Sequence, residues 1–277
     1  MSQVPSITLN NGLEMPQLGF GVWQVPDDEA TTAVATAIES GYRSIDTAAI
    51  YGNEVGTGKG VAASGVPREE LFITTKLWNA DQGFDSTLRA FDASLDKLGL
   101  EYVDLYLIHW PLPVKDAYVD TYKALEKIHA DGRAKSIGVS NFLPSHLERL
   151  MGETSVVPAV NQIELHPQFQ QAELRAFHAR HGIVTEAWSP LGQGKGLGVP
   201  TVAAIAHKHG RTPAQVVLRW HLQTGHVAIP KSVTPSRIVE NLDVFGFELD
   251  ADDLAAFAAL DDNLRIGADP AVFDAGA

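Results

Sequence analysis

The feature that most constrains the fold of this chain is a regular alternation of short apolar runs with longer stretches of helical period. Each apolar run has strand character, and each is followed by a stretch in which apolar residues recur at helical spacing. Eight such units predict a parallel sheet, and eight units within roughly 250 residues predict a sheet closed into a barrel. The predicted strands are 18–22, 44–46, 71–75, 103–108, 136–139, 159–163, 183–187 and 227–229. The predicted helices are 28–40, 53–64, 85–98, 117–130, 144–151, 171–181, 201–222 and 235–243.

Both ends of the chain lie outside this repeat. Asn11–Gly12 follows a short strand-like run and favours a tight turn, so an N-terminal β-hairpin is predicted. An amphipathic stretch after Asp250 predicts an extra C-terminal helix, followed by a tail from Asn263 to Ala277. Because no linker or change of composition divides the chain, we predict a single α/β domain over residues 1–277, a (β/α)₈ TIM barrel. An open doubly wound sheet is the competing fold.

The charge balance limits the partners of the chain. Its 34 acidic and 21 basic residues give a formal net charge of −13, which nucleic acid and anionic membrane surfaces repel. We therefore expect neither as a partner, and any bound anion must meet a local cluster of cations. Met1 to Gly12 lacks the pattern of a signal peptide, and no apolar run reaches the ~18 residues of a membrane span. These features predict a cytoplasmic protein, which we expect to be a monomer.

Polar and aromatic residues follow the ends of the predicted strands. In a barrel of this kind the C-terminal ends of all eight strands face one mouth, where active sites lie. A barrel kept only for stability could carry such residues anywhere, so their concentration at one rim predicts a functional site. These residues are Trp23, Asp46, Lys76, His109, Ser140, Asn141, Gln162, Trp188, Ser189, Lys231 and Ser232.

Four titratable residues of this mouth, Asp46, Tyr51, Lys76 and His109, can act together as an acid. A phenol has an ordinary pKa near ~10, and the ammonium of Lys76 is expected to lower the pKa of Tyr51. Asp46 can hold Lys76 charged, and His109 can orient a substrate oxygen. Such a group can protonate the oxygen of a carbonyl as it is reduced. Asp46, Lys76 and His109 also fit a purely structural ion-pair network. The sequence motifs around them are therefore needed to distinguish a catalytic group from a structural one.

Seven runs between Gly41 and Asn241 resemble the aldo-keto reductase superfamily, closest to the bacterial 2,5-diketo-gluconate reductases and the related prostaglandin F synthase group. The N-terminal hairpin and last helix also fit, so the resemblance covers nearly the whole chain. It implies reduction of aldehyde or ketone groups of small molecules by NADPH, with Asp46, Tyr51, Lys76 and His109 as catalytic residues and Tyr51 as proton donor. The runs are G-Y-R-S-I-D-T-A-A-I-Y-G-N-E, F-I-T-T-K-L-W, D-L-Y-L-I-H-W-P, I-G-V-S-N-F, N-Q-I-E-L-H-P, W-S-P-L-G-Q-G and I-P-K-S-V-T-P-S-R-I-V-E-N.

The same resemblance implies the residues that bind cofactor and substrate. Trp188 would stack on the nicotinamide ring, where the family more often has tyrosine. The residues that would hold the nicotinamide carboxamide are Ser140, Asn141 and Gln162. Those that would bind the 2′-phosphate and adenine of NADPH are Lys231, Ser232, Arg237 and Asn241, at a helix N-terminus suited to an anion. Further cofactor contacts are implied for Ser189, Leu191, Gln193 and Val233. The substrate pocket would be lined by Trp23, Trp78, His109 and Trp110.

Three other sequence patterns, for a phosphate-binding loop, a dinucleotide fingerprint and a metal site, are incomplete or absent. The run 56–59 resembles a phosphate-binding loop, but Asn53 and Gly60 stand where that motif needs glycine and Ser or Thr. The glycines of 192–198 lack the third glycine of a dinucleotide fingerprint at Leu197, and we interpret this segment as a flexible loop over the cofactor. No H-E-x-x-H pair occurs, and we predict no metal site.

Two other functions stay open at this point. A regulatory subunit could use the same fold to bind a nicotinamide cofactor without turnover. A barrel isomerase or hydrolase would need a second carboxylate beside Asp46, and the most available one, Glu164, lies within a predicted strand. His166, after the same strand, has no assigned role.

Overall fold

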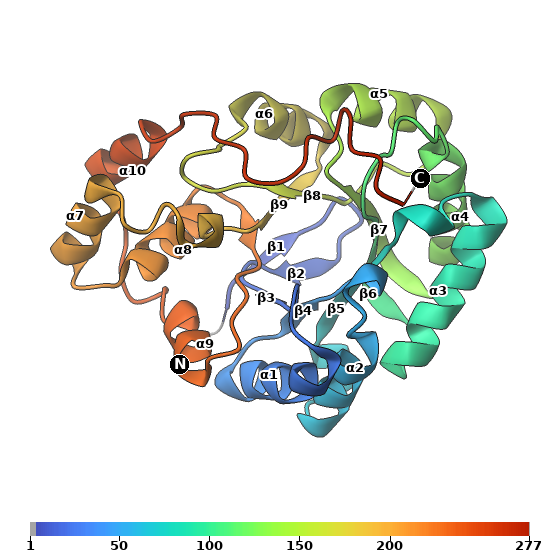
Figure 1. Ribbon diagram of the computed structural model, residues 1–277, viewed down its shortest axis with the longest axis horizontal. Coiled ribbons are helices and arrows are strands. Elements are labelled where there is room, and N and C mark those ends of the chain that lie inside the picture. Colours follow the sequence, from blue (N-terminus) through green and yellow to red (C-terminus); the bar gives the residue numbers. More distant parts are fainter. Residues whose placement is uncertain (1–3, 277) are drawn as a thin grey trace.

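Eight parallel strands form one sheet that closes on itself. A computed structural model describes residues 4–276, so Met1–Gln3 of the predicted N-terminal segment and Ala277 of the predicted tail lie outside it. Strands follow one another in chain order, and Leu18 pairs with Ala228 to join the first strand to the last. This confirms the (β/α)₈ barrel over the open sheet (Figure 1). The strands are β3 (Phe20–Gly21), β4 (Ser44–Asp46), β5 (Phe72–Leu77), β6 (Val103–Ile108), β7 (Ala134–Ser140), β8 (Val160–Glu164), β9 (Val184–Trp188) and β10 (Val227–Ala228).

The helices surround the sheet, and one predicted helix is wrong. The stretch 201–222 forms two helices, because Thr212 accepts the backbone N–H of Gln215 and caps a new helix that begins at Pro213. None of the described helices is long and apolar enough to cross a membrane. The helices are α1 (Asp27–Ser40), α2 (Glu54–Ala63), α3 (Phe84–Leu98), α4 (Tyr118–Ala130), α5 (Pro144–Glu153), α6 (Ala172–His181), α7 (Pro200–His209), α8 (Pro213–Gln223), α9 (Pro235–Leu242) and α10 (Ala251–Ala258).

The glycines of the run 56–59 lie within α2 and have a packing role. A Cβ at Gly56 would lie 2.0 Å from the carbonyl oxygen of Asp27, and one at Gly58 would lie 2.0 Å from that of Leu98. Only glycine allows α2 to approach its two neighbours this closely, so these residues position helices.

The predicted N-terminal hairpin closes the barrel end opposite the strand C-termini. It pairs β1 (Ser6–Thr8) with β2 (Glu14–Pro16), and the side-chain amides of Asn10 and Asn11 donate to backbone oxygens of Pro158 and Lys135, just before β8 and at the start of β7. Leu9 and Met15 are buried in one apolar cluster with Leu105, Val160, Val184 and Val227. This floor leaves the other end of the barrel for polar residues.

Strand register arranges the interior side chains of β8 and β9 in three levels. Val160 pairs with Val184 near the floor, Gln162 pairs with Glu186 in the middle, and Glu164 pairs with Trp188 at the mouth. The intervening Asn161 and Thr185 instead face outward, because both bond to His178 of α6. The polar character of the interior therefore begins one level below the mouth.

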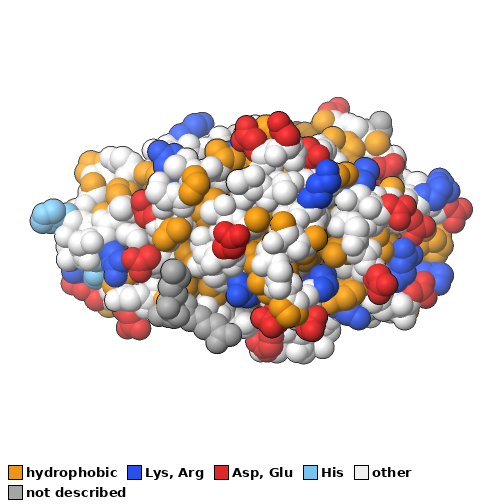
Figure 2. Space-filling model, turned by 90° about the horizontal axis from the view of Figure 1, so that it is seen from below, with side chains coloured by type: hydrophobic (Ala, Val, Ile, Leu, Met, Phe, Trp, Pro, Cys, Tyr) orange, Lys and Arg blue, Asp and Glu red, His pale blue; other side chains and the backbone are white. Residues whose placement is uncertain are grey.

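The chain after α10 forms a tail that runs along one side of the mouth, beside α6 and α5 (Figure 1, red). The backbone oxygen of Gln168 accepts the N–H groups of Asp262 and Leu264, and the rings of Phe273 and Trp110 lie 4.2 Å apart. On the face shown in Figure 2, acidic, basic and apolar side chains are interspersed, and no extended basic area covers that face.

Candidate active site

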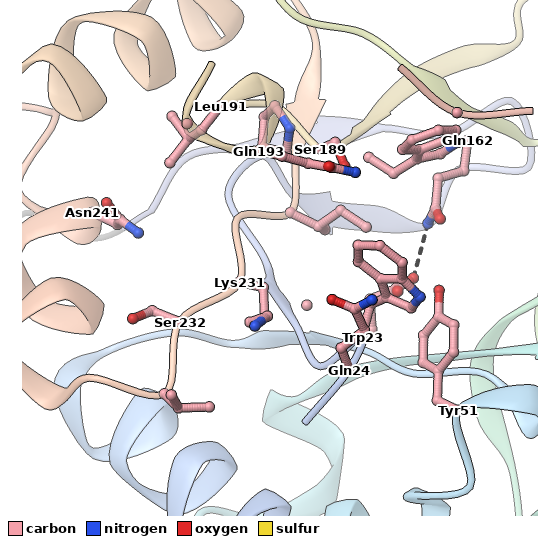
Figure 3. Close-up of a pocket in the computed structure, with 18 of the residues that line it drawn as sticks. Trp23, Gln24, Tyr51, Gln162, Ser189, Leu191, Gln193, Lys231, Ser232 and Asn241 are labelled. Carbon is pink, nitrogen blue, oxygen red and sulfur yellow. Dashed lines mark hydrogen bonds between the residues drawn. The ribbon is translucent and has the colours of Figure 1, made fainter. Parts of the chain in front are cut away.

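A cavity of about 1070 Å³ occupies the barrel mouth. This volume slightly exceeds the usual range for ligand pockets, which ends at about 1,000 Å³, so the cavity has room for a large cofactor and a small substrate. Every site residue predicted from the sequence lines this cavity except Lys76, which is fully buried beneath it. Figure 3 shows Tyr51 and Gln162 at one end of the cavity and Ser232 and Asn241 at the other.

Tyr51 is the last residue of a 3₁₀ turn, η1 (Ala49–Tyr51), that follows β4. Gly52 ends this turn with a φ of +67°, a conformation that glycine adopts without strain. The next residue, Asn53, is fully buried, and its amide donates to the backbone oxygens of Val22 and Val25. These bonds fix the loop after β4 to the loop after β3, and so hold Tyr51 over the mouth.

Lys76 lies at the centre of the titratable group. Its Nζ donates to Oδ1 of Asp46 at 2.5 Å and to the backbone oxygen of Thr47 at 2.9 Å, and it lies 5.1 Å from the centre of the Tyr51 ring. The ring of His109 meets that of Tyr51 edge-on, with centres 5.7 Å apart. The structure thus brings together all four residues that the sequence singled out.

Burial sets the protonation of these residues. It raises the pKa of Tyr51 above its ordinary value: Lys76 lowers this pKa as predicted, but burial outweighs that contribution and the net shift is upward. Burial would lower the pKa of Lys76, but the charge and hydrogen bond of Asp46, together with the smaller contributions of Tyr51 and Glu186, outweigh it and raise that pKa. Burial, with the charge of Lys76, lowers the pKa of His109 well below its usual range. At neutral pH the group therefore holds a protonated phenol, a charged lysine and a neutral histidine.

The second carboxylate near Asp46 is Glu186, which the sequence analysis missed. The side-chain nitrogen of Gln162 donates to Oδ2 of Asp46 at 2.8 Å and to Oε2 of Glu186 at 2.9 Å. Glu164, the candidate from the sequence, instead accepts the backbone N–H groups of Ile266 and Gly267 from the tail. Glu186 does not line the cavity, so the geometry gives no support to a hydrolase or isomerase that uses paired carboxylates.

Asn141 and Trp188 are bonded to each other at the nicotinamide end predicted from the sequence. The indole N–H of Trp188 donates to Oδ1 of Asn141 at 2.8 Å, and the amide of Asn141 donates to Oγ of Ser140. Gly267 of the tail lies against the far edge of the indole, where an added Cβ would be 2.5 Å from Cη2 of Trp188. One edge of the ring is therefore held by the barrel and the other by the tail.

The opposite end of the cavity is cationic. Lys231 and Arg237 lie before and at the start of α9, and neither forms an ion pair within residues 4–276. Ser232 accepts the N–H of Thr234, the residue just before α9, and Thr234 and Arg237 both line the cavity. Cations that lack acidic partners beside a helix N-terminus form a site for an anion.

Positive φ angles gather around the cavity. Gln24, Asn141, Ser189 and Gln193 have φ between 47° and 65° and all line it. Such conformations are uncommon outside glycine and often mark functional sites. Gln24 was missed because nothing in the sequence distinguishes it, although it directly follows Trp23.

Aromatic rings and the tail surround the substrate end of the cavity. Trp78 lies edge-on to His109 with ring centres 5.4 Å apart, and Trp110 lies against Phe273. The tail also contributes Gly267 and Ala268 to the lining. Tail residues were not identified individually from the sequence, because a segment without periodicity gives no signal of what it covers.

The glycine-rich segment after Trp188 also covers part of the cavity. It forms a short 3₁₀ turn, η4 (Gly192–Gly194), and Leu191, Gln193 and Leu197 line the cavity beside it. Its flexibility stays a prediction. In the part of the chain that is described, no group of three His, Asp or Glu residues is arranged to hold a metal ion.

Comparison with known proteins places this chain in a family. The model of the aldo/keto reductase family matches residues 15–262, and the chain belongs to that family. An aldo-keto reductase of Mycolicibacterium smegmatis is 57% identical over 98% of each chain. Methylglyoxal reductase DkgA of Escherichia coli is 54% identical over 99% of each chain. The crystal structure of a Gox0644 mutant in complex with NADPH is 54% identical, with a TM-score of 0.95 over 99% of each chain.

Proposed function

We propose that this protein reduces aldehyde or ketone groups of small molecules to alcohols, with hydride from NADPH and a proton from Tyr51. The observation that carries this proposal is the buried lysine between Asp46 and Tyr51, next to a cavity whose far end is cationic. A structural ion pair has no need of a phenol and a neutral imidazole facing the same cavity. The particular similarity of this chain to the 2,5-diketo-gluconate reductases stays a prediction.

The cavity fits an extended, phosphorylated cofactor. Lys231 and Arg237, both without acidic partners among the described residues, would bind its 2′-phosphate, and Ser232, Val233 and Asn241 would surround its adenosine. Bound NADPH supplies a hydride at its nicotinamide ring. Trp188 would pack on that ring. The residues that would contact the nicotinamide carboxamide or the pyrophosphate are Ser140, Asn141, Gln162, Ser189, Leu191 and Gln193.

The chain's own residues supply the proton. Because burial raises the pKa of Tyr51, the phenol keeps its proton until negative charge develops on a nearby oxygen. Lys76 then stabilises the phenolate that is left, and Asp46 keeps Lys76 charged and in place. A neutral His109 can donate one N–H to the same substrate oxygen, so two donors polarise the carbonyl.

The substrate end suits small carbonyl compounds. Trp23, Trp78 and Trp110 line it, and the tail covers it, so water is partly excluded from the reacting atoms. A 54% identical relative is named a methylglyoxal reductase, which supports small aldehydes as substrates. Every residue of the proposed site comes from one chain, and we propose that the protein acts as a monomer. The cytoplasmic location stays a prediction.

A steady-state assay tests this function. NADPH oxidation should depend on added aldehyde, with one alcohol formed per NADPH consumed, and NADH should be the poorer cofactor because it lacks the phosphate that Lys231 and Arg237 bind. The measurement is a panel of small aldehydes and ketones with each cofactor. Tight NADPH binding without turnover of any carbonyl would instead identify the cofactor-binding regulatory subunit.

A further inference from the structure

Glu186 is a buried carboxylate that the proposed reaction does not use. It lies in the middle of β9, is fully buried, and one of its oxygens, Oε1, has no hydrogen-bond partner among residues 4–276. Leaving a buried acceptor unpaired costs stability, so an ordinary core position would favour an apolar side chain here. The presence of a glutamate at this buried position therefore needs a reason, and the contacts that link it to the active site above it offer one.

The contacts of Gln162 provide that explanation. Its side-chain nitrogen has two hydrogens, and it donates one to Asp46 and one to Glu186. The ionised carboxylate of Asp46 can only accept, and Oε2 of Glu186 accepts the second N–H, so the nitrogen end of the amide faces both side chains. The amide oxygen Oε1 of Gln162 is then turned away from both carboxylates, toward the cavity that Gln162 lines.

We propose that Glu186 is a positioning residue: with Asp46 it fixes the Gln162 amide so that its carbonyl oxygen faces the cofactor's carboxamide. With Asp46 as the sole acceptor, one N–H of Gln162 would lose its partner and a single hydrogen bond would hold the amide less rigidly. The inference rests on the proposed function, because Gln162 needs a fixed orientation only where it binds a ligand.

The surroundings of Glu186 add an electrostatic consequence. Asp46 of β4, Lys76 of β5 and Tyr51 of η1 face it across the barrel, Gln162 flanks it on β8, and its partner on β10 is the apolar Val227. Burial, followed by the charge of Asp46, raises the pKa of Glu186 to about 8. Glu186 therefore stays protonated over a pH range in which an exposed glutamate is ionised, and its ionisation in more alkaline solution raises the pKa of Tyr51 further.

Two variants separate orientation from charge. Glu186→Gln keeps an acceptor for Gln162 and removes the ionisation, whereas Glu186→Leu removes both. NADPH affinity, measured by tryptophan fluorescence, should fall at least about fivefold in Glu186→Leu, as expected for one oriented hydrogen bond, and stay within about twofold in Glu186→Gln. The alkaline limb of the pH profile of kcat/KM should move to lower pH in Glu186→Gln, because no added negative charge then raises the pKa of Tyr51.

Val184→Ala is the matched control, since Val184 lies on the same face of β9 one level nearer the floor. It should lower the thermal unfolding temperature of the protein without cofactor and leave NADPH affinity unchanged. Equal loss of affinity in Val184→Ala and Glu186→Leu would overturn the inference, as would wild-type affinity in Glu186→Leu or an unshifted alkaline limb in Glu186→Gln. A wild-type protein that fails to bind NADPH would overturn the proposed function itself.

Discussion

Two buried glutamates, one level apart in the barrel, show how differently this fold treats the same side chain. Burial would raise the pKa of Glu164, but hydrogen bonds from His166 and from the N–H groups of Ile266 and Gly267 outweigh it and lower that pKa. Burial also raises the pKa of Glu186, which has one hydrogen-bond donor and the like charge of Asp46 nearby. The number of donors that reach each carboxylate decides its charge.

The opposite pKa shifts of the two glutamates match their different roles at the mouth and one level below it. At the mouth, an ionised Glu164 fastens the tail that covers the substrate end, and it gives His166 a role that the sequence did not reveal. Below it, a neutral Glu186 completes a hydrogen-bond network around Gln162 without adding charge beside Lys76 and Asp46. The same residue type therefore serves as an anchor in one position and as a neutral acceptor in the other.

The largest predicted effect concerns the stability of Glu186→Gln at different pH values. In the unfolded chain Glu186 ionises with the ordinary glutamate pKa of 4.5, whereas the folded protein keeps it protonated up to about pH 8. Wild-type stability therefore falls as pH rises from 4.5 to 8, and the variant escapes this loss. The free energy of unfolding of Glu186→Gln, measured in urea, should increase relative to wild type by a few kcal/mol over this interval, since one pKa unit corresponds to about 1.4 kcal/mol. A difference that does not change with pH would show that Glu186 is ionised in the folded protein.

Glu164→Gln should show the opposite behaviour, with a smaller effect. A lowered folded pKa means that the stabilisation is present above the unfolded pKa and is lost as pH falls through the folded pKa. The variant should lose about 1–3 kcal/mol of unfolding free energy at pH 7, because one backbone N–H loses its acceptor, and this deficit should shrink in acid. Hydrogen exchange should report faster exchange at Ile266 and Gly267. If the exchange rates at these two amides match wild type, Glu164 does not anchor the tail.

The two glutamates also illustrate which features of the fold and site can be predicted from the sequence. The eight units and the four titratable residues were predictable, because strands and their C-terminal ends follow directly from local patterns. Glu186 was missed because it lies inside a strand, although the alternation of side chains along a strand places it on the same face as Trp188, two residues later. The contact between Glu164 and the tail joins residues about 100 positions apart, and no local pattern encodes such a pairing.

The Tyr51→Phe variant removes only the phenolic hydroxyl, the proposed proton donor. Turnover of a small aldehyde and NADPH affinity are measured on the same preparation. We expect turnover to fall about 10²-fold or more, as for removal of a general acid. NADPH affinity should stay close to wild type, because the hydroxyl acts only as charge develops on the substrate oxygen. A phenylalanine variant that keeps more than about a tenth of wild-type turnover would contradict proton donation by Tyr51.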